Sequence, residues 1–178
     1  METIKTATYG SPVGQMILGS CGDKLCICDW SFGKLRSTHD RRICRLLDAV
    51  FAEESSEVIK DAMVQLDQYF AGQRTEFSIP IRFAGTEFQC SVWSELMRIP
   101  YGETISYAEV ARRIDKPDAV RAVASAIATN PISIFVPCHR VVGSNSKLTG
   151  YAGGLEAKQH LLSLEAHVIR NMHPIYLK

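Results

Sequence analysis

The chain has 178 residues, 46% of them hydrophobic, and a formal net charge of +1, which is enough to bury a core in one domain or in two small ones. It contains no run of about 18 apolar residues and no apolar signal core at its N-terminus, so we expect no membrane span, no export and a cytoplasmic location. The near-neutral charge excludes a generally basic nucleic-acid coat protein, and six irregularly spaced cysteines suit a reducing compartment better than a disulfide framework. The charge is uneven: residues 1–80 carry nine Lys and Arg against eleven Asp and Glu, and residues 81–178 carry eleven against eight. This weakly favours the second part for contact with a polyanion.

The first 80 residues predict a small α/β unit. Its expected elements are strands over 14–18 and 25–30, then helices over about 40–53 and 57–71. Gly22-Asp23 supplies turn chemistry between the strands, and Gly72 is a natural helix stop. The extended stretch 78–81 marks the expected boundary between a domain over 1–80 and a domain over 81–178.

From Thr86 onward the pattern is helical. The first helix has an apolar stripe and ends near 99–102, and the second opens with a predicted capping box, Ser106-x-x-Glu109. A break at 115–118 supplies capping residues for a third helix. The core stripe of this third helix consists of Val120, Val123, Ala124 and Ile127. Two short helices joined by a short turn resemble a helix-turn-helix.

The third helix has almost no side-chain bulk on its remaining faces. Its only long side chain there is Arg121, and the other residues are small: Ala119, Ala122, Ser125, Ala126 and Thr129. A helix that reads base edges in the major groove normally offers Arg, Gln or Asn. The small residues therefore indicate either close helix packing or a backbone that approaches DNA without reading its sequence.

The chemistry of the chain is concentrated around Cys138. The apolar run 132–136 reads as a buried extended segment, and Pro137 should end it, which would present Cys138 at a rigid edge. A free thiol has a pKa of about 8.5, so an imidazole such as that of His139 is the kind of neighbour that would activate it. For this pair alone, a buried Cys138 beside a surface His139 is the simpler explanation.

Five motifs in a fixed order reverse that judgement. They are Gly-Glu-Thr-Ile-Ser-Tyr (102–107), Arg-Ala-Val-Ala-Ser-Ala (121–126), Asn-Pro (130–131), Val-Pro-Cys-His-Arg-Val-Val-Gly (136–143) and Gly-Tyr-Ala-Gly-Gly-Leu (150–155). Together they resemble the methylated-DNA–protein-cysteine methyltransferases, which repair O6-alkylguanine. The resemblance is strong over about 85–167 and holds only in outline over the first 80 residues. It implies an α/β + α fold: a small ribonuclease H-like α/β domain, then a helical domain with a winged-helix-like helix-turn-helix.

The resemblance also implies catalytic roles. Cys138 would take the alkyl group from guanine O6, while His139 and Glu165 would form a relay that keeps the thiol deprotonated, commonly through a water. Tyr107 would donate a proton or hydrogen bond to the leaving guanine, and Asn130 would hold the two halves of the motif together. The alternatives are a solvated Glu165 on the last helix, a core aromatic at Tyr107 and a simple turn residue at Asn130.

Binding roles are implied in the same way. Arg121 would enter the base stack in place of the extruded nucleotide, on a DNA-binding surface shared with Ala122, Ser125 and Ala126. A loop from Tyr151 to Gly154 would cover the base, whose edge would be read by backbone groups of Cys138, Val141 and Ala152. The alternatives are a phosphate contact or surface charge for Arg121 and a merely flexible turn for the two glycines.

The implied function is stoichiometric DNA repair, in which each molecule acts once because the S-alkylcysteine product has no leaving group. The partner is double-stranded DNA containing alkylated guanine; O4-alkylthymine and the preferred alkyl size, which Ile127 and Ser133 could tune, stay open. We expect a monomer without a cofactor. Some relatives bind a structural zinc, and Cys21 and Cys26 match two of its ligands, but no third and fourth follow, so we predict no metal. The rival functions are a DNA-binding regulator, a Cys-His hydrolase and a damage sensor that does not react.

Overall fold

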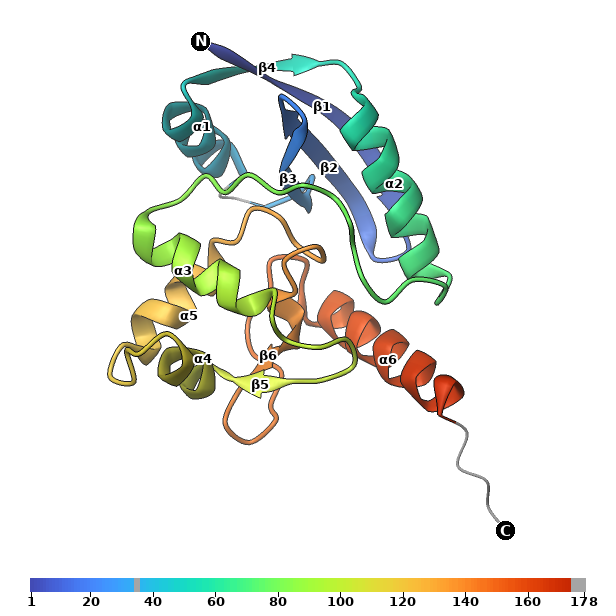
Figure 1. Ribbon diagram of the computed structural model, residues 1–178, viewed down its shortest axis with the longest axis vertical. Coiled ribbons are helices and arrows are strands. Elements are labelled where there is room, and N and C mark those ends of the chain that lie inside the picture. Colours follow the sequence, from blue (N-terminus) through green and yellow to red (C-terminus); the bar gives the residue numbers. More distant parts are fainter. Residues whose placement is uncertain (34–35, 174–178) are drawn as a thin grey trace.

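The computed structural model describes residues 1–33 and 36–173, and its N-terminal part is built on a mixed four-stranded sheet (Figure 1). The strands are β1 (Glu2–Ser11), β2 (Gly14–Cys21), β3 (Lys24–Trp30) and β4 (Ala49–Glu53), in the order β3-β2-β1-β4. β2 is antiparallel to β1 and β3, whereas β4 runs parallel to β1. The two predicted strands lie within β2 and β3, and the sequence reading missed β1 and β4.

The helix predicted over 40–53 is wrong in its second half. Helix α1 spans Arg36–Leu47 and ends at Asp48, whose positive φ of 48° breaks the helical path. The chain then enters β4, and Glu2 N donates to Asp48 O at 2.8 Å. Pairing with β1, a strand some 45 residues earlier in the chain, overrides the local helix preference of these residues.

Helix α2 (Glu57–Phe70) forms as the sequence predicts. Ser56 is its N-cap, with the hydroxyl accepting from Ile59 N at 3.2 Å. Its buried stripe includes Leu66 and Tyr69, and the helix packs along the sheet (Figure 1). Gly72 follows with a φ of +72°, a conformation that favours glycine.

The C-terminal part is mainly helical. Its elements are α3 (Glu87–Leu96), β5 (Ile105–Ser106), α4 (Tyr107–Arg113), α5 (Val120–Ala128), a 3₁₀ turn (Cys138–Arg140), β6 (Val141–Val142) and α6 (Leu155–Met172). β5 pairs in parallel with β6, and α4 packs on α5. This order agrees with a small α/β unit followed by a helical unit that carries a helix-turn-helix.

The helix caps differ from those predicted. Thr86 and Gln89 form a reciprocal capping box at the N-terminus of α3. The sequence analysis did not predict this box. At α4 only half of the predicted box forms: the Ser106 hydroxyl accepts from Glu109 N, but the Glu109 carboxylate binds Arg112 and Arg113 instead.

Likewise α5 starts after Ala119 without a side-chain cap, so the capping role predicted for residues 115–118 is wrong.

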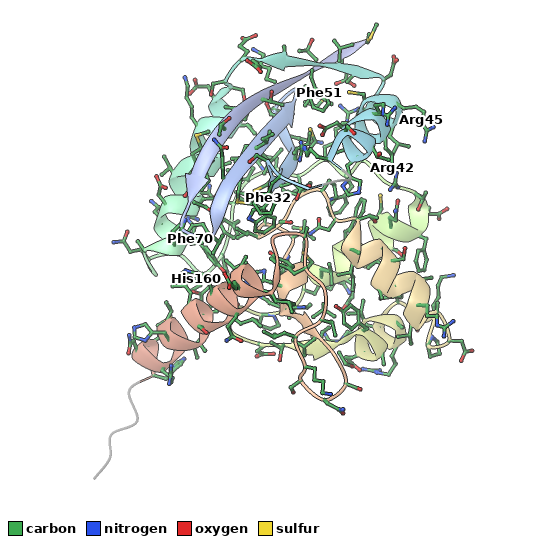
Figure 2. The ribbon with its side chains drawn as sticks, turned by 180° about the vertical axis from the view of Figure 1, so that it is seen from behind. Phe32, Arg42, Arg45, Phe51, Phe70 and His160 are labelled. Carbon is green, nitrogen blue, oxygen red and sulfur yellow. The ribbon has the colours of Figure 1, made fainter. Side chains whose placement is uncertain are left out.

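The free edge of β3 ties the two parts together. Cys28 exchanges backbone hydrogen bonds with the C-terminal part, its N–H donating to Pro131 O at 2.9 Å and its carbonyl accepting from Ser133 N at 2.7 Å. Phe70 of α2 also lies beside His160 of α6 (Figure 2). The sheet of the N-terminal part therefore supports the segment that leads to Cys138.

Candidate active site

Asn130 shapes the chain just before the cysteine. Its side-chain amide donates to Val136 O at 3.0 Å and its oxygen accepts from Ile132 N at 3.0 Å. Between them Ile134 has a φ of +73°, which is rare for a β-branched residue and costs strain. The predicted extended run 132–136 is therefore a buried tight turn, because Ser133 pairs with Val136 within it.

Cys138 begins the 3₁₀ turn directly after Pro137. The residue is only 5% exposed and belongs to the hydrophobic core, so the expectation that Cys138 lies at a rigid edge outside the core is wrong. The turn buries His139 and Arg140 beside it.

Glu165 of α6 is the centre of a buried hydrogen-bond network and is 0% exposed. His139 Nε2 donates to its Oε1 at 2.7 Å. Arg140 donates from Nε to Oε2 at 2.9 Å and from Nη2 to Oε1 at 3.0 Å. Gly102 N donates to Oε2 at 3.0 Å, and Tyr69 OH donates to Oε1 at 2.8 Å. The fold thus brings Glu165 to His139, which the sequence alone could not establish.

The protonation states follow from burial and from this network. Burial alone would raise the pKa of Glu165, but the hydrogen bonds and charges of His139 and Arg140 outweigh it and lower that pKa to about 2. Burial lowers the pKa of His139, against the opposing pull of Glu165. The imidazole is therefore neutral and held by a carboxylate.

The thiol itself rests in its protonated form. Burial raises the pKa of Cys138, and the nearby polar side chains of Asn130 and Ser133 with the charge of Lys158 offset this only in part. Within residues 1–33 and 36–173, the buried Nδ1 of His139 has no hydrogen-bond partner. Burial thus favours the neutral thiol at rest, and the predicted relay from His139 to Cys138 through a water stays a prediction.

A small cavity of about 30 Å³ opens beside Cys138, room for little more than water. Its lining combines α4, α5, the Asn130 turn and the loop before α6: Tyr107, Ala124, Ile127, Ala128, Asn130, Ser133, Cys138, Gly150, Tyr151 and Ala152. Tyr107 OH also shares a hydrogen bond of 2.8 Å with Thr149 Oγ1. Most of the residues predicted for catalysis and base contact therefore meet at one cavity.

The N-terminal part packs against the loop before α6, which lines this cavity. The rings of Trp30 and Tyr151 meet edge to face with centroids 5.2 Å apart. Gly153 lies so close to the indole that a Cβ there would stand 2.4 Å from its ring carbons. Glycine is required at position 153 because the backbone passes so close to the indole.

Lys158 is a residue of the site that the sequence reading missed. Its Nζ is buried and donates to Val141 O at 2.6 Å and to Thr149 O at 3.2 Å, so the backbone oxygen of Val141 already has a donor. Burial lowers the pKa of Lys158. A signal was present, because Lys158 and Glu165 share one helical stripe with the buried Leu161.

The helix-turn-helix presents one open face of α5. Arg121, Ala122 and Ser125 are exposed on it. Ala126 is only 3% exposed and its carbonyl accepts from Trp93 Nε1 at 2.8 Å. Ala126 is thus buried beside Trp93 of α3, which disagrees with the prediction that it contacts DNA.

Cys21 of the N-terminal part lies beside an ion pair. Cys21 Sγ donates to Glu2 Oε2 at 3.1 Å, and Arg82 pairs with the same carboxylate at 2.8 Å; a guanidinium at this position repels cations. Across residues 1–33 and 36–173, no three His, Cys, Asp or Glu side chains gather to hold a metal ion.

Among the helices described, none is long and apolar enough to cross a membrane.

Comparison with known proteins identifies the family. Residues 4–83 match the model of the 6-O-methylguanine DNA methyltransferase ribonuclease-like domain, and residues 87–167 match that of its DNA binding domain. A relative from Methanosarcina acetivorans, "Methylated-DNA--protein-cysteine methyltransferase", is 43% identical over 89% of this chain and 96% of its own length. The chain belongs to the 6-O-methylguanine DNA methyltransferase family.

Further relatives agree with this assignment. An inducible methylated-DNA--protein-cysteine methyltransferase of Bacillus subtilis is 49% identical over 67% of this chain, a match that spans 66% of the relative's own length. The crystal structure of Mycobacterium tuberculosis OGT in complex with DNA is similar with a TM-score of 0.78 and 39% identity, covering 93% of this chain and 94% of that one. The fold and the family are therefore shown together.

Proposed function

We propose that this methyltransferase-family protein repairs O6-alkylguanine in double-stranded DNA by moving the alkyl group to Cys138, once per molecule. The observation that carries the proposal is the juxtaposition of Cys138 with the His139–Glu165 pair beside a cavity bordered by α5. The names of the relatives and the DNA complex of a similar structure support the same reaction.

The chemistry follows from the protonation states. Neutral His139 takes the thiol proton at Nδ1, through a water, and Glu165 stabilises the imidazolium that forms. The sulfur of Cys138 then attacks the alkyl carbon in line, the bond from that carbon to guanine O6 breaks, and its electron pair stays on the purine. Tyr107 donates a proton to the leaving guanine. The product is a thioether without a leaving group, so no second turnover follows.

Base binding requires a change at the cavity. Its volume of about 30 Å³ cannot hold a purine, so the loop over 143–154 moves outward as the base enters. The exposed Ala122 and Ser125 let the α5 backbone approach DNA closely, and Arg121 fills the gap that the flipped nucleotide leaves. Backbone groups of Cys138, Val141 and Ala152 then read the edge of the base, while Val141 O also keeps its hydrogen bond from Lys158 Nζ.

We propose further that the chain forms two domains, acts in the cytoplasm and works as a monomer. The division into domains over 1–80 and 81–178 is supported by the ends of the two family-model matches. A cytoplasmic location is supported by six cysteines that are all free. We propose a monomer that uses no cofactor, since the damaged base itself supplies the alkyl group.

The test is one incubation with a duplex that contains O6-methylguanine, followed by intact mass and peptide mapping. We expect a single methyl group on the peptide that contains Cys138, and then no further reaction. Cys138→Ala should lose transfer but still bind DNA, whereas Cys90→Ala, at a partly exposed cysteine that does not line the cavity, should react normally. Continued turnover, or methylation elsewhere, would contradict the proposal; DNA binding without any adduct would favour the sensor, and preference for one palindrome would favour the regulator.

A further inference from the structure

Tyr69 is a buried side chain from the N-terminal part that reaches the relay. It lies near the end of α2, is 0% exposed, and its hydroxyl donates to Glu165 Oε1 at 2.8 Å. The two residues are 96 positions apart in the chain. The ring packs against Phe77 at 5.5 Å and Tyr101 at 6.0 Å between centroids, so the position of the hydroxyl is set by aromatic packing.

This hydroxyl shares one oxygen with the catalytic imidazole. Oε1 of Glu165 accepts from Tyr69 OH, His139 Nε2 and Arg140 Nη2, whereas Oε2 accepts from Arg140 Nε and Gly102 N. The terminal torsion of a glutamate has a broad energy profile, so these donors decide which way the carboxylate faces. Burial, with the charge of Glu165, holds the pKa of Tyr69 well above its usual value, and the hydroxyl remains a donor throughout the working range.

We propose that Tyr69 is a positioning residue for the His139–Glu165 pair, supplied by the N-terminal domain. The inference rests on the proposed function, because it assigns Tyr69 to the proton relay of that reaction. The proposal also gives the N-terminal domain a direct part in the chemistry. The Tyr69 hydroxyl aligns the Glu165 carboxylate and takes up part of the negative charge on Oε1.

Loss of the hydroxyl has a predictable sign. With one donor fewer, Oε1 carries more unbalanced charge, so the imidazolium of His139 becomes more stable and its pKa rises. Transfer needs the neutral imidazole, so the acid limb of the rate profile moves to higher pH. The other charged or titratable groups that face the pair are Arg140, Tyr101, Lys158 and Cys138, and the substitution leaves all four in place.

The experiment compares the full-length protein with Tyr69→Phe, which keeps the packed ring. The substrate is free O6-benzylguanine, which involves no DNA contact. Its single-turnover rate is measured by intact mass between pH 5.5 and 9. We expect about a tenfold loss of rate near pH 6.5, equivalent to about 1.4 kcal/mol, and a smaller loss near pH 8.5. NMR titration of the His139 ring, assigned by its absence in His139→Gln, should show a higher pKa in the variant.

The matched control is Tyr9→Phe. Tyr9 is also a buried tyrosine of the N-terminal domain, and its hydroxyl donates to Asp67 of α2 at 2.7 Å, outside the network of Glu165. This control should leave both the rate profile and the His139 titration unchanged. An unmoved His139 titration in Tyr69→Phe, whatever its rate or thermal stability, overturns the inference.

Failure of the proposed function is seen separately. If the unmodified protein gives no adduct at Cys138, the reaction is wrong. The NMR titration still decides whether Tyr69 sets the state of His139.

Discussion

Replacing Glu165 by glutamine should separate the two things this carboxylate does. The substitution keeps the size of the side chain but removes its charge, and it turns an –NH₂ group toward donors. Arg140 is nearly fully buried, and its two hydrogen bonds to Glu165 measure 2.9 and 3.0 Å. With glutamine, this guanidinium is left buried without a counter-charge, and His139 loses the acceptor that stabilises its charged form.

The magnitude follows from the burial. Removing one partner of a buried ion pair costs about 3–5 kcal/mol. For a chain of this size each kcal/mol lowers the unfolding midpoint by about 2–4 °C, so Glu165→Gln should unfold roughly 6–20 °C lower. Transfer to Cys138 should fall more steeply than stability, because the imidazole has lost its partner even in the molecules that remain folded.

The assay is chemical and thermal unfolding followed by tryptophan fluorescence, together with the single-turnover rate at a temperature where both proteins are folded. Glu156→Gln is the control: it removes the same charge from the first turn of the same helix, where the side chain is exposed, and should cost less than about 1 kcal/mol. Equal stability of Glu165→Gln and Glu156→Gln would refute the view that Glu165 balances a buried arginine.

Three further predictions rest on separate features. Because the pKa of Glu165 is lowered from 4.5 to about 2 in the folded state, its contribution to stability is complete above pH 4.5 and is lost as the pH falls toward 2; unfolding curves at pH 5, 3.5 and 2.5 should show this, and Glu165→Gln should lack it. Arg121→Ala should slow repair of duplex DNA by about tenfold for each 1.4 kcal/mol of lost support but leave reaction with free O6-benzylguanine intact; an equal loss on both substrates would assign Arg121 to the pocket or the fold. Gly153→Ala should impair reaction with both substrates, because its Cβ meets the Trp30 ring at 2.4 Å, whereas Gly10→Ala, outside the site, has open space and should react normally; if Trp30→Leu fails to restore Gly153→Ala, the clash is not the cause.

Patterns local in the chain were readable from the sequence. The apolar stripes of α2 and α3 repeat within about four turns of helix, and the motif around Cys138 is a contiguous run, so both could be found without knowing the fold. The resemblance carried by that motif also named His139, Asn130 and Glu165, which the structure brings to one site through Asn130's turn and α6.

Other features of the fold and the site depend on contacts between distant segments, so only the tertiary structure decided them. Residues 49–53 form a strand because β1 is available to pair with them, although their local pattern favours a helix. In the sequence, Glu165 and Lys158 look like charged residues of an ordinary amphipathic helix. In the folded protein they are buried beside the Cys138 turn. Tyr69 reaches Glu165 across 96 residues of sequence. A side chain's burial and partners are properties of the packed molecule, so a local pattern names the residues that can do chemistry, and packing decides their protonation states and their partners.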